Sequence, residues 1–286
     1  MRIEEYLLQV IRREKTGIVP WLILVVLTML AQIYRVTVYI RKKLYDWGIK
    51  KSKALDCTVI SVGNITVGGT GKTPTVKKLA TDLEQAGYSS VILSRGYKGE
   101  FDEEIGVVSS GDSVLMSAEE AGDEPYLLAR FLDSIPVIVG SKRKKTGKYA
   151  CARFNPDFII LDDGFQHWQV ARDYDIVAID AVHPFGSEEL LPGGLLREPL
   201  SSLERADTVV ITRADQVNED QLDKIKSKVR TINSDLEIII TKHQPTYLRD
   251  LITNEKQKID LKNKRTMAVS GIGNPRSFEM TLEELG

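Results

Sequence analysis

Residues 61–75 read SVGNITVGGTGKTPT and follow the apolar run CTVI at 57–60, in the order strand, glycine-rich loop, helix start. Such a loop turns its backbone N–H groups toward phosphate oxygens, and the following helix N-terminus adds positive potential. The common formula places a glycine five positions before Gly71, where this chain has Thr66. The stretch therefore predicts a nucleotide site with a variant phosphate loop, and a purely structural glycine turn is the alternative.

The residue types of this loop suggest separate roles. Lys72 is expected to neutralise the β- and γ-phosphates and Thr73 to offer its hydroxyl to magnesium. Pro74 is tolerated because it falls in the first helical turn. The predicted nucleotide-binding residues are Thr66, Gly68, Gly69, Thr70, Gly71, Lys72 and Thr73.

From Leu55 onward, short β-branched runs alternate with helical stretches. The runs are CTVISV (57–62), SSVILS (89–94), IPVIVG (135–140), PDFIILDD (156–163), YDIVAID (174–180) and DTVVITR (207–213). This alternation predicts an α/β fold of the P-loop NTPase type, with a parallel sheet covered on both faces. Ligands of such sheets bind outside the carboxyl ends of the strands.

Length and charge limit the other possibilities. The chain has 286 residues, enough for a main domain over 55–230 and a smaller C-terminal α/β portion over 231–286. It has 39 basic and 40 acidic residues, and this balance gives no indication of nucleic-acid binding.

The N-terminal segment, residues 1–54, is expected to associate with a membrane. Nineteen residues from Thr16 to Tyr34 carry no charge and would reach roughly 28 Å as a helix, close to a hydrocarbon thickness. Bases lie on both sides of this run. We therefore expect a helix from Trp21 through Leu44 that lies in one leaflet or dips into it. A membrane span and a buried core helix are the alternatives.

The second element that indicates a site is FIILDDGFQH at 158–167. Four apolar residues lead into Asp162 and Asp163, as in a buried strand that delivers carboxylates to magnesium or its water shell. Neighbouring strand residues point to opposite faces, so one is expected to serve the metal and the other a network or a base. Alone, the pair would also suit an ordinary strand-end turn.

Three further motifs carry charged residues at expected strand or helix ends. SRGYKG places Arg95 after a strand, although an exposed arginine before a glycine turn is ordinary. AGDEPYLLAR opens a helix with Asp123 and Glu124, which would equally suit an N-cap and an acidic first turn. LLPGGLLREP places Arg197 and Glu198 beside a proline-glycine loop, where a lid or a substrate clamp is expected.

Together these motifs resemble the tetraacyldisaccharide 4′-kinase family, the lipid A 4′-kinases of Gram-negative bacteria. The matching motifs cover about residues 50–215 and are SVGNITVGGTGKTP, LSRGYKG, AGDEPYLLA, DFIILDDGFQH, LLPGGLLREP and ITRAD. The resemblance implies the cofactors ATP and Mg²⁺ and an acceptor hydroxyl at the 4′ position of a lipid A disaccharide precursor. It also implies a monomer at the cytoplasmic face of the inner membrane, held peripherally or monotopically by the N-terminal helix.

The resemblance also implies roles for particular residues. Lys72 and Thr73 bind phosphate and magnesium, and Asp123 is the base that prepares the sugar hydroxyl. The implied metal network comprises Asp162 and Asp163, with Gln166, His167 and Glu198 nearby. Arg95 or Arg197 balances charge on the transferred phosphoryl group.

Two departures from the family pattern and two rival functions remain. Many relatives have a histidine where SGIGNPRSF has Asn274, and relatives continue beyond TLEELG, so we expect an incomplete second domain. The first rival is a membrane-tethered nucleotide switch, because ITRAD resembles a base-recognition motif of some G-proteins with Arg213 in the usual lysine position. A non-catalytic membrane scaffold is the other, but it gives no reason for the phosphate loop and both aspartates to occur together.

Overall fold

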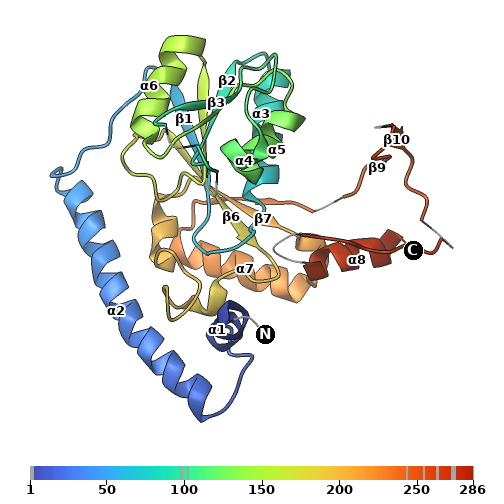
Figure 1. The fold of residues 1–286 in the computed structure, drawn as a ribbon. Coiled ribbons are helices and arrows are strands. Elements are labelled where there is room, and N and C mark those ends of the chain that lie inside the picture. Colours follow the sequence, from blue (N-terminus) through green and yellow to red (C-terminus); the bar gives the residue numbers. More distant parts are fainter. Residues whose placement is uncertain are drawn as a thin grey trace.

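The computed structural model describes residues 3–96, 99–101, 103–242, 244–253, 255–261, 264–271 and 275–285. A central sheet carries helices on both faces, and the long helix α2 stands at one side of it (Figure 1). The strand order is β3-β4-β2-β5-β1-β6-β7-β8, and all neighbours are parallel except β3 and β4. The predicted α/β fold with a mostly parallel sheet is confirmed.

Six strands lie where the apolar runs predicted them. They are β1 (Thr58–Gly63), β2 (Ser90–Ser94), β4 (Val137–Val139), β5 (Phe158–Asp162), β6 (Tyr174–Asp180) and β7 (Thr208–Thr212). The sequence reasoning did not predict the edge strands β3 (Gly106–Ser109) and β8 (Glu237–Ile240), or the small separate sheet of β9 (Leu248–Arg249) and β10 (Lys256–Gln257). Since β8 pairs with β7, the main sheet continues past residue 230, where we placed the domain boundary.

Helices cover the two faces because strand side chains alternate in direction. Ile60 and Val62 pack with Val76 and Ala80 of α3 (Lys72–Gln85) in one apolar cluster. That cluster also holds α5 (Asp123–Phe131), which contacts α3 on the same face. On the opposite face, α6 (Arg143–Phe154) covers β2 and β4, and α7 (Glu219–Ile232) packs on the β6–β7 half. The remaining elements are α4 (Ala118–Ala121), α8 (Pro275–Leu285) and the 3₁₀ turns η1 (Gly186–Glu188), η2 (Leu200–Arg205) and η3 (Ala214–Gln216).

The sheet topology reverses direction at β1. The chain leaves β1 through α3 to reach β2 on one side, whereas β5 is followed by β6 on the other side of β1. Ligands of open α/β sheets bind in the crevice at such a switch point. Here the crevice lies at the carboxyl ends of β1 and β5, where the phosphate loop and the two aspartates meet.

The N-terminal region forms two helices, α1 (Ile3–Ile11) and α2 (Ile18–Asp46). Pro20 falls in the first turn of α2, as expected, and the helix extends the predicted range at both ends. Among its residues only Ala31 is buried. By length and composition α2 is the one helix of the described residues that could cross a membrane, and its exposure excludes the alternative of a buried core helix.

Candidate active site

The phosphate loop, residues 64–71, joins β1 to α3. Thr66, at the position of the missing glycine, is buried and forms an isolated antiparallel bridge with Leu196. Next to it, the Val67 N–H donates to the Leu195 carbonyl oxygen (2.8 Å). The chain is therefore extended at residue 66, and extended backbone is open to any residue type. This bridge explains why the loop departs from the common formula.

Two glycines make the turn into α3. Gly68 (φ 113°) and Gly71 (φ 82°) adopt the left-handed region, which favours glycine. A Cβ atom on Gly71 would also lie 2.9 Å from Cγ2 of Thr212. The helix then begins at Lys72 without an acidic side chain in its first turn. Its N-terminus thus keeps the positive potential that favours phosphate.

The ends of β6 and β7 hold the loop from outside. The Thr212 hydroxyl donates to the Thr70 carbonyl oxygen (3.0 Å) and the Arg213 guanidinium to that of Gly69 (2.8 Å). Arg213 is itself fixed by a largely buried ion pair with Asp180. These bonds turn the carbonyl oxygens of Gly69 and Thr70 toward β6 and β7. Within the loop, the Val67 and Thr70 N–H groups already donate to the carbonyl oxygens of Leu195 and Gly68, so a phosphate would be bound by the other N–H groups.

Lys72, Asp163, Arg197 and Asn64 come together beside this loop. The Lys72 Nζ lies 3.7 Å from Oδ1 of Asp163. Arg197 donates to both carboxylate oxygens of Asp163, at 2.6 and 3.0 Å, and to Oδ1 of Asn64 at 3.0 Å. Burial works to raise the pKa of Asp163, but the Arg197 hydrogen bonds and Lys72 outweigh it, and the pKa lies below its ordinary value. Asp163 is therefore ionised and lies between two cations, Lys72 and Arg197.

Asp163 also has an unusual backbone. Its φ of 54° places a non-glycine residue in the left-handed region directly after β5. Such strain persists where the surroundings impose it, and it is concentrated at functional sites. The turn is held by the Gly164 N–H, which donates to the Val62 carbonyl oxygen at 3.1 Å. The two neighbouring aspartates contact different partners, but Asp163 lies in the turn after β5 and not in the strand as expected, and the division of roles between them remains a prediction.

Asp162, the last residue of β5, is buried beside Ser94 at the end of β2. The Ser94 hydroxyl donates to its Oδ2 at 2.9 Å, while its Oδ1 is buried without a hydrogen-bond partner in the described part of the chain. Burial is the main cause that raises the pKa of Asp162 to about 6. A buried carboxylate oxygen without a hydrogen-bond donor lowers the stability of the folded chain, and a bound cation would remove this cost.

Arg143, at the start of α6, is a buried cation behind this carboxylate. It donates to the carbonyl oxygens of Gly140 (2.6 Å) and Asp162 (3.2 Å). Burial lowers the pKa of Arg143 to about 10, against the opposing charges of Asp162 and Asp163. The guanidinium thus remains charged at neutral pH and offsets the two carboxylates.

The donor set fits magnesium as P-loop proteins hold it. The described residues contain no group of three or more His, Cys, Asp or Glu side chains that would form a complete protein cage. Magnesium at phosphoryl-transfer sites instead takes one or two carboxylates or hydroxyls from the protein and completes its shell with phosphate oxygens and water. The Oδ1 of Asp162 is a suitable oxygen ligand, and Lys72, the neighbour of the predicted ligand Thr73, is near enough for its charge to act on Asp162.

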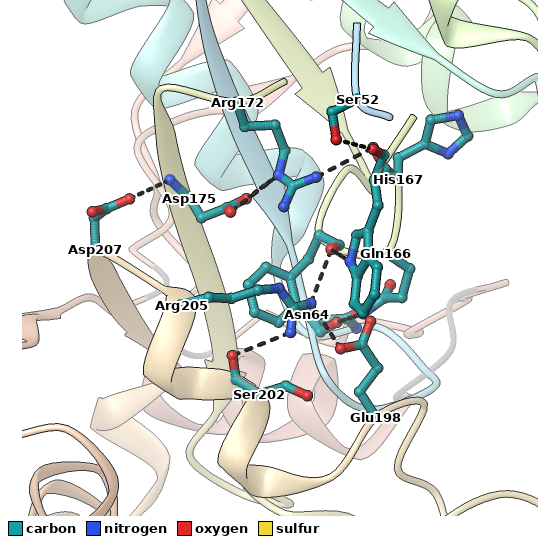
Figure 2. Close-up of polar contacts among 12 residues, drawn as sticks. Ser52, Asn64, Gln166, His167, Arg172, Asp175, Glu198, Ser202, Arg205 and Asp207 are labelled. Atoms are coloured by element: carbon teal, nitrogen blue, oxygen red, sulfur yellow. Dashed lines mark hydrogen bonds and ion pairs between the residues drawn. The ribbon is translucent and has the colours of Figure 1, made fainter. Parts of the chain in front are cut away.

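Glu198 lies in a second polar network behind the site (Figure 2). Its carboxylate is buried and pairs with Arg205 at 2.7 Å. The Arg205 guanidinium also lies 3.7 Å from the Phe165 ring centre. In the same network the Gln166 amide donates to the Asn64 carbonyl oxygen (2.8 Å), and burial lowers the pKa of His167 to about 4. Gln166 thus contacts the phosphate loop at Asn64, whereas Glu198 contacts Arg205, and the predicted role of Glu198 as a metal ligand remains a prediction.

Asp123 opens α5 at the same end of the sheet. Gly122 is the N-cap residue, and its neighbour Asp123 is exposed in the first helical turn. Asp123 is therefore not the N-cap, but the other half of that alternative is confirmed, because Asp123 and Glu124 form an acidic first turn. The next residue, Glu124, is close enough for its charge to raise the pKa of Asp162. Arg95 is exposed directly after β2, and its charge acts on Arg143 and His167.

Sequence reasoning missed three residues of this region. Arg143 belongs to a run of bases, SKRKKTGK, which is typical of a solvated surface. Asn64 follows β1 directly inside the motif, and this position was the available signal. Asp180 closes an apolar strand and pairs with Arg213, but neither residue indicates the other in sequence. Asn274, the predicted departure from the family, lies outside the described residues.

Comparison with known proteins gives one consistent family. The family model described as LpxK, Tetraacyldisaccharide-1-P 4′-kinase, matches residues 23–286. A tetraacyldisaccharide 4′-kinase of Halothermothrix orenii is 42% identical over 296 residues, which cover 100% of this chain and 77% of that protein. One of Syntrophus aciditrophicus is 44% identical over 261 residues, covering 88% of this chain and 70% of that protein.

A solved structure agrees with the sequence relatives. The crystal structure of LpxK from Aquifex aeolicus in complex with ATP matches with a TM-score of 0.72 and 36% identity. The match covers 90% of this chain and 76% of that one. The likeness therefore extends over most of the chain's length.

Proposed function

This chain belongs to the tetraacyldisaccharide 4′-kinase family, and we propose that it transfers the γ-phosphate of ATP to the 4′-hydroxyl of a tetraacyl disaccharide 1-phosphate, a lipid A precursor. As a member of this family it is a kinase. The observation that carries the residue assignment is the convergence of Lys72, Asp163, Arg197 and Asn64 beside the phosphate loop.

Phosphoryl transfer depends on positioning and charge neutralisation more than on covalent chemistry. Loop N–H groups and Lys72 would hold the β- and γ-phosphates. Lys72 would then contact a phosphate oxygen instead of Asp163. Arg197, already oriented by Asp163 and Asn64, would balance charge on the equatorial oxygens of the transferred group. Because these groups are oriented before the reaction, little reorganisation is needed in the transition state.

Thr73 and Asp162 would hold magnesium, and Asp163 would contribute through its water shell. A magnesium ion held by these residues would supply positive charge against the negative charge that develops on the phosphate oxygens. The unpartnered Oδ1 of Asp162 supports this assignment. A pKa of about 6 leaves that carboxylate mostly ionised, and therefore able to bind a cation, at neutral pH.

Asp123 is proposed as the base for the acceptor hydroxyl. It stands exposed at the N-terminus of α5, at the carboxyl edge of the sheet, without a role as helix cap. A carboxylate in that position can accept the hydroxyl proton as the phosphoryl group arrives. Arg95, exposed at the neighbouring strand end, would approach the anionic acceptor or the phosphoryl group.

Helix α2 is proposed to bind the cytoplasmic leaflet of the inner membrane. Seven exposed apolar residues recur every three or four positions along one side, and we call them the apolar stripe: Ile18, Leu22, Val26, Met29, Ile33, Val36 and Ile40. A contiguous exposed stripe of this kind marks a membrane or protein contact. The opposite side packs on the protein, where a Cβ on Gly193 would lie 3.3 Å from that of Ala31. Because one side of α2 packs on the protein, we favour a helix lying in one leaflet over a span surrounded by lipid.

One assay tests the proposed activity. The full chain is incubated with γ-labelled ATP, magnesium and a tetraacyl disaccharide 1-phosphate in mixed micelles, and the label in the lipid is measured. We expect lipid-bound label that depends on the acceptor and is resistant to removal of free phosphate. Slow ATP hydrolysis at the same rate with and without acceptor, and no labelled lipid, would support the nucleotide switch instead.

A further inference from the structure

Helix α2 contacts a residue of the candidate active site directly. The Tyr34 hydroxyl, on the protein-facing side of the helix, donates to the main-chain carbonyl oxygen of Arg197 at 2.8 Å. The main-chain N–H of Arg197 donates to the carbonyl oxygen of Ile65 in the phosphate loop at 2.7 Å. The main chain of Arg197 is thus held on one side by the phosphate loop and on the other by α2.

A second contact lies further along the same helix. Arg41 donates to the carbonyl oxygen of Gln166 at 2.8 Å, and Gln166 donates through its amide to the carbonyl oxygen of Asn64 at 2.8 Å. The Arg41 guanidinium also stands 5.5 Å from the Trp168 ring centre. Asn64 accepts from Arg197, so both contacts of α2 lead to the same cation.

The helix is placed by close packing between and around these contacts. A Cβ on Gly193 would lie 3.1 Å from the Thr28 Cα, so glycine lets the two backbones approach closely. The ring of Tyr45 meets that of Trp168 edge-on, with centroids 5.4 Å apart. Contacts at Thr28, Tyr34, Arg41 and Tyr45 follow one side of α2, opposite the apolar stripe.

We propose that Tyr34 and Arg41 are positioning residues of the kinase reaction, so that α2 forms a wall of the active site in addition to binding the membrane. Tyr34 sets the main chain of Arg197, and Arg41 sets the segment that carries Gln166. The inference rests on the proposed function, because the role of Arg197 belongs to that proposal. It differs from membrane attachment, which depends on the other side of the helix.

Tyr34→Phe tests the first contact with little change of shape. Tyr39→Phe is the matched control, because Tyr39 lies on the same helix with its side chain exposed. The loss of one hydrogen bond to Arg197 is expected to lower kcat by about threefold to tenfold, with the KM for ATP and liposome flotation unchanged. The control is expected to match wild type in all three measurements.

A double-mutant cycle shows whether Tyr34 acts through Arg197. Tyr34→Phe is combined with Arg197→Lys, which keeps the charge but loses the two-point contact with Asp163. We expect Tyr34→Phe to have little further effect on kcat in the Arg197→Lys background. For the second contact, Arg41→Gln is expected to lower kcat by a similar factor and its neighbour Lys42→Gln to leave kcat unchanged.

The outcomes separate this inference from the proposed function. If the wild-type chain labels no lipid, the proposed function fails and the inference fails with it. If wild type labels the lipid while Tyr34→Phe and Arg41→Gln have wild-type kcat, only the inference is overturned. A reduction by Tyr34→Phe that is equally large with Arg197→Lys also overturns it, because Tyr34 would then act independently of Arg197. Thermal unfolding of each variant identifies losses caused by misfolding.

Discussion

The helices α2 and α3 reverse the usual relation between sequence and burial. The sequence of α3, KTPTVKKLATDLEQ, is largely polar, yet it packs Val76 and Ala80 into the sheet. The sequence of α2 is far more apolar and twice as long, yet Ala31 is its only buried residue. In water the hydrophobic effect would bury the apolar helix first.

The difference is explained if the two helices have different surroundings, water for α3 and the proposed lipid for α2. Helix α3 has a water-facing side, and its N-terminus is proposed to hold the phosphates. The apolar stripe of α2 is exposed in the described part of the chain, and the proposed membrane contact would cover it. The two helices can therefore be tested separately. A change in α3 should affect catalysis and leave liposome binding unchanged, and a change in the apolar stripe of α2 should do the reverse.

The largest expected effect lies at the start of α3. Lys72→Ala is expected to lower kcat/KM by about 10³-fold or more, since removal of a cation from a phosphoryl-transfer site has effects of that order. Folding and liposome flotation should be unchanged because Lys72 contacts Asp163 and not the core. Lys78→Ala, at an exposed position of the same helix, is the control. Wild-type turnover in Lys72→Ala would contradict the phosphate-loop assignment.

The next effect concerns α5, on the same face as α3. Asp123→Asn is expected to lower kcat by about 10² to 10⁴, as for lost general-base assistance, with ATP affinity nearly intact. Because Gly122 is the N-cap, the substitution should not shorten the helix. Equilibrium binding of ATP and steady-state kinetics measure the two properties. A wild-type kcat would place the base elsewhere, with Asp163 the next candidate.

The apolar stripe of α2 is tested by polar substitution and not by deletion, because deletion would also remove the contacts with Arg197 and Gln166. A variant with Val26, Met29 and Ile33 replaced by Gln should bind liposomes about a thousandfold more weakly, since each buried aliphatic side chain contributes about 1.5 kcal/mol or more. Flotation over a range of lipid concentrations measures this change. A variant with Leu115, Leu251 and Ile252 replaced by Gln, all exposed elsewhere, is the control. Equal flotation of both variants would exclude the stripe as the membrane contact.

The smallest expected effect is on the stability of the folded chain, which the buried charge of Asp162 lowers. Burial raises the pKa of Asp162 from 3.8 to about 6 in the folded chain. The folded chain therefore binds this proton more tightly than the unfolded chain, and the stabilisation that results is lost as pH rises through about 6. In magnesium-free buffer at pH 8, Asp162→Asn should therefore be more stable than wild type by about 3 kcal/mol, or several degrees in Tm. The advantage should fade between pH 6 and pH 4. An advantage that persists at pH 4 would show that the buried charge is not its cause.

The sequence predicted the strands that are apolar and lie inside the sheet. Strand β3 was missed because Gly106–Ser109 is antiparallel at an edge, where only one neighbour, β4, is required. Strand β8, EIII, is mostly exposed, and its pairing with β7 is a tertiary contact that its own composition does not specify. Helix α1 lies before the uncharged run and was not considered as a separate element.

For the site, the sequence predicted the residues that belong to recognisable motifs. Lys72, Asp163 and Arg197 were each named from separate motifs, and the fold brings them into contact. Arg143 and Asp180 could not be found in this way, because each acts through a partner distant in sequence. The contact of Tyr34 with Arg197 spans 163 positions and depends on the docking of α2, which no local pattern specifies.

The bridge between Thr66 and Leu196 limits how far the phosphate loop can be treated as a transferable module. A loop that depends on glycines carries its conformation in its own sequence and can be grafted onto another strand and helix. Here part of the conformation is supplied by residues 195 and 196, which would have to be transferred with the loop. Residues 61–75 alone, placed in a foreign scaffold, would therefore be expected to lose the extended backbone at Thr66 and much of their affinity for nucleotide.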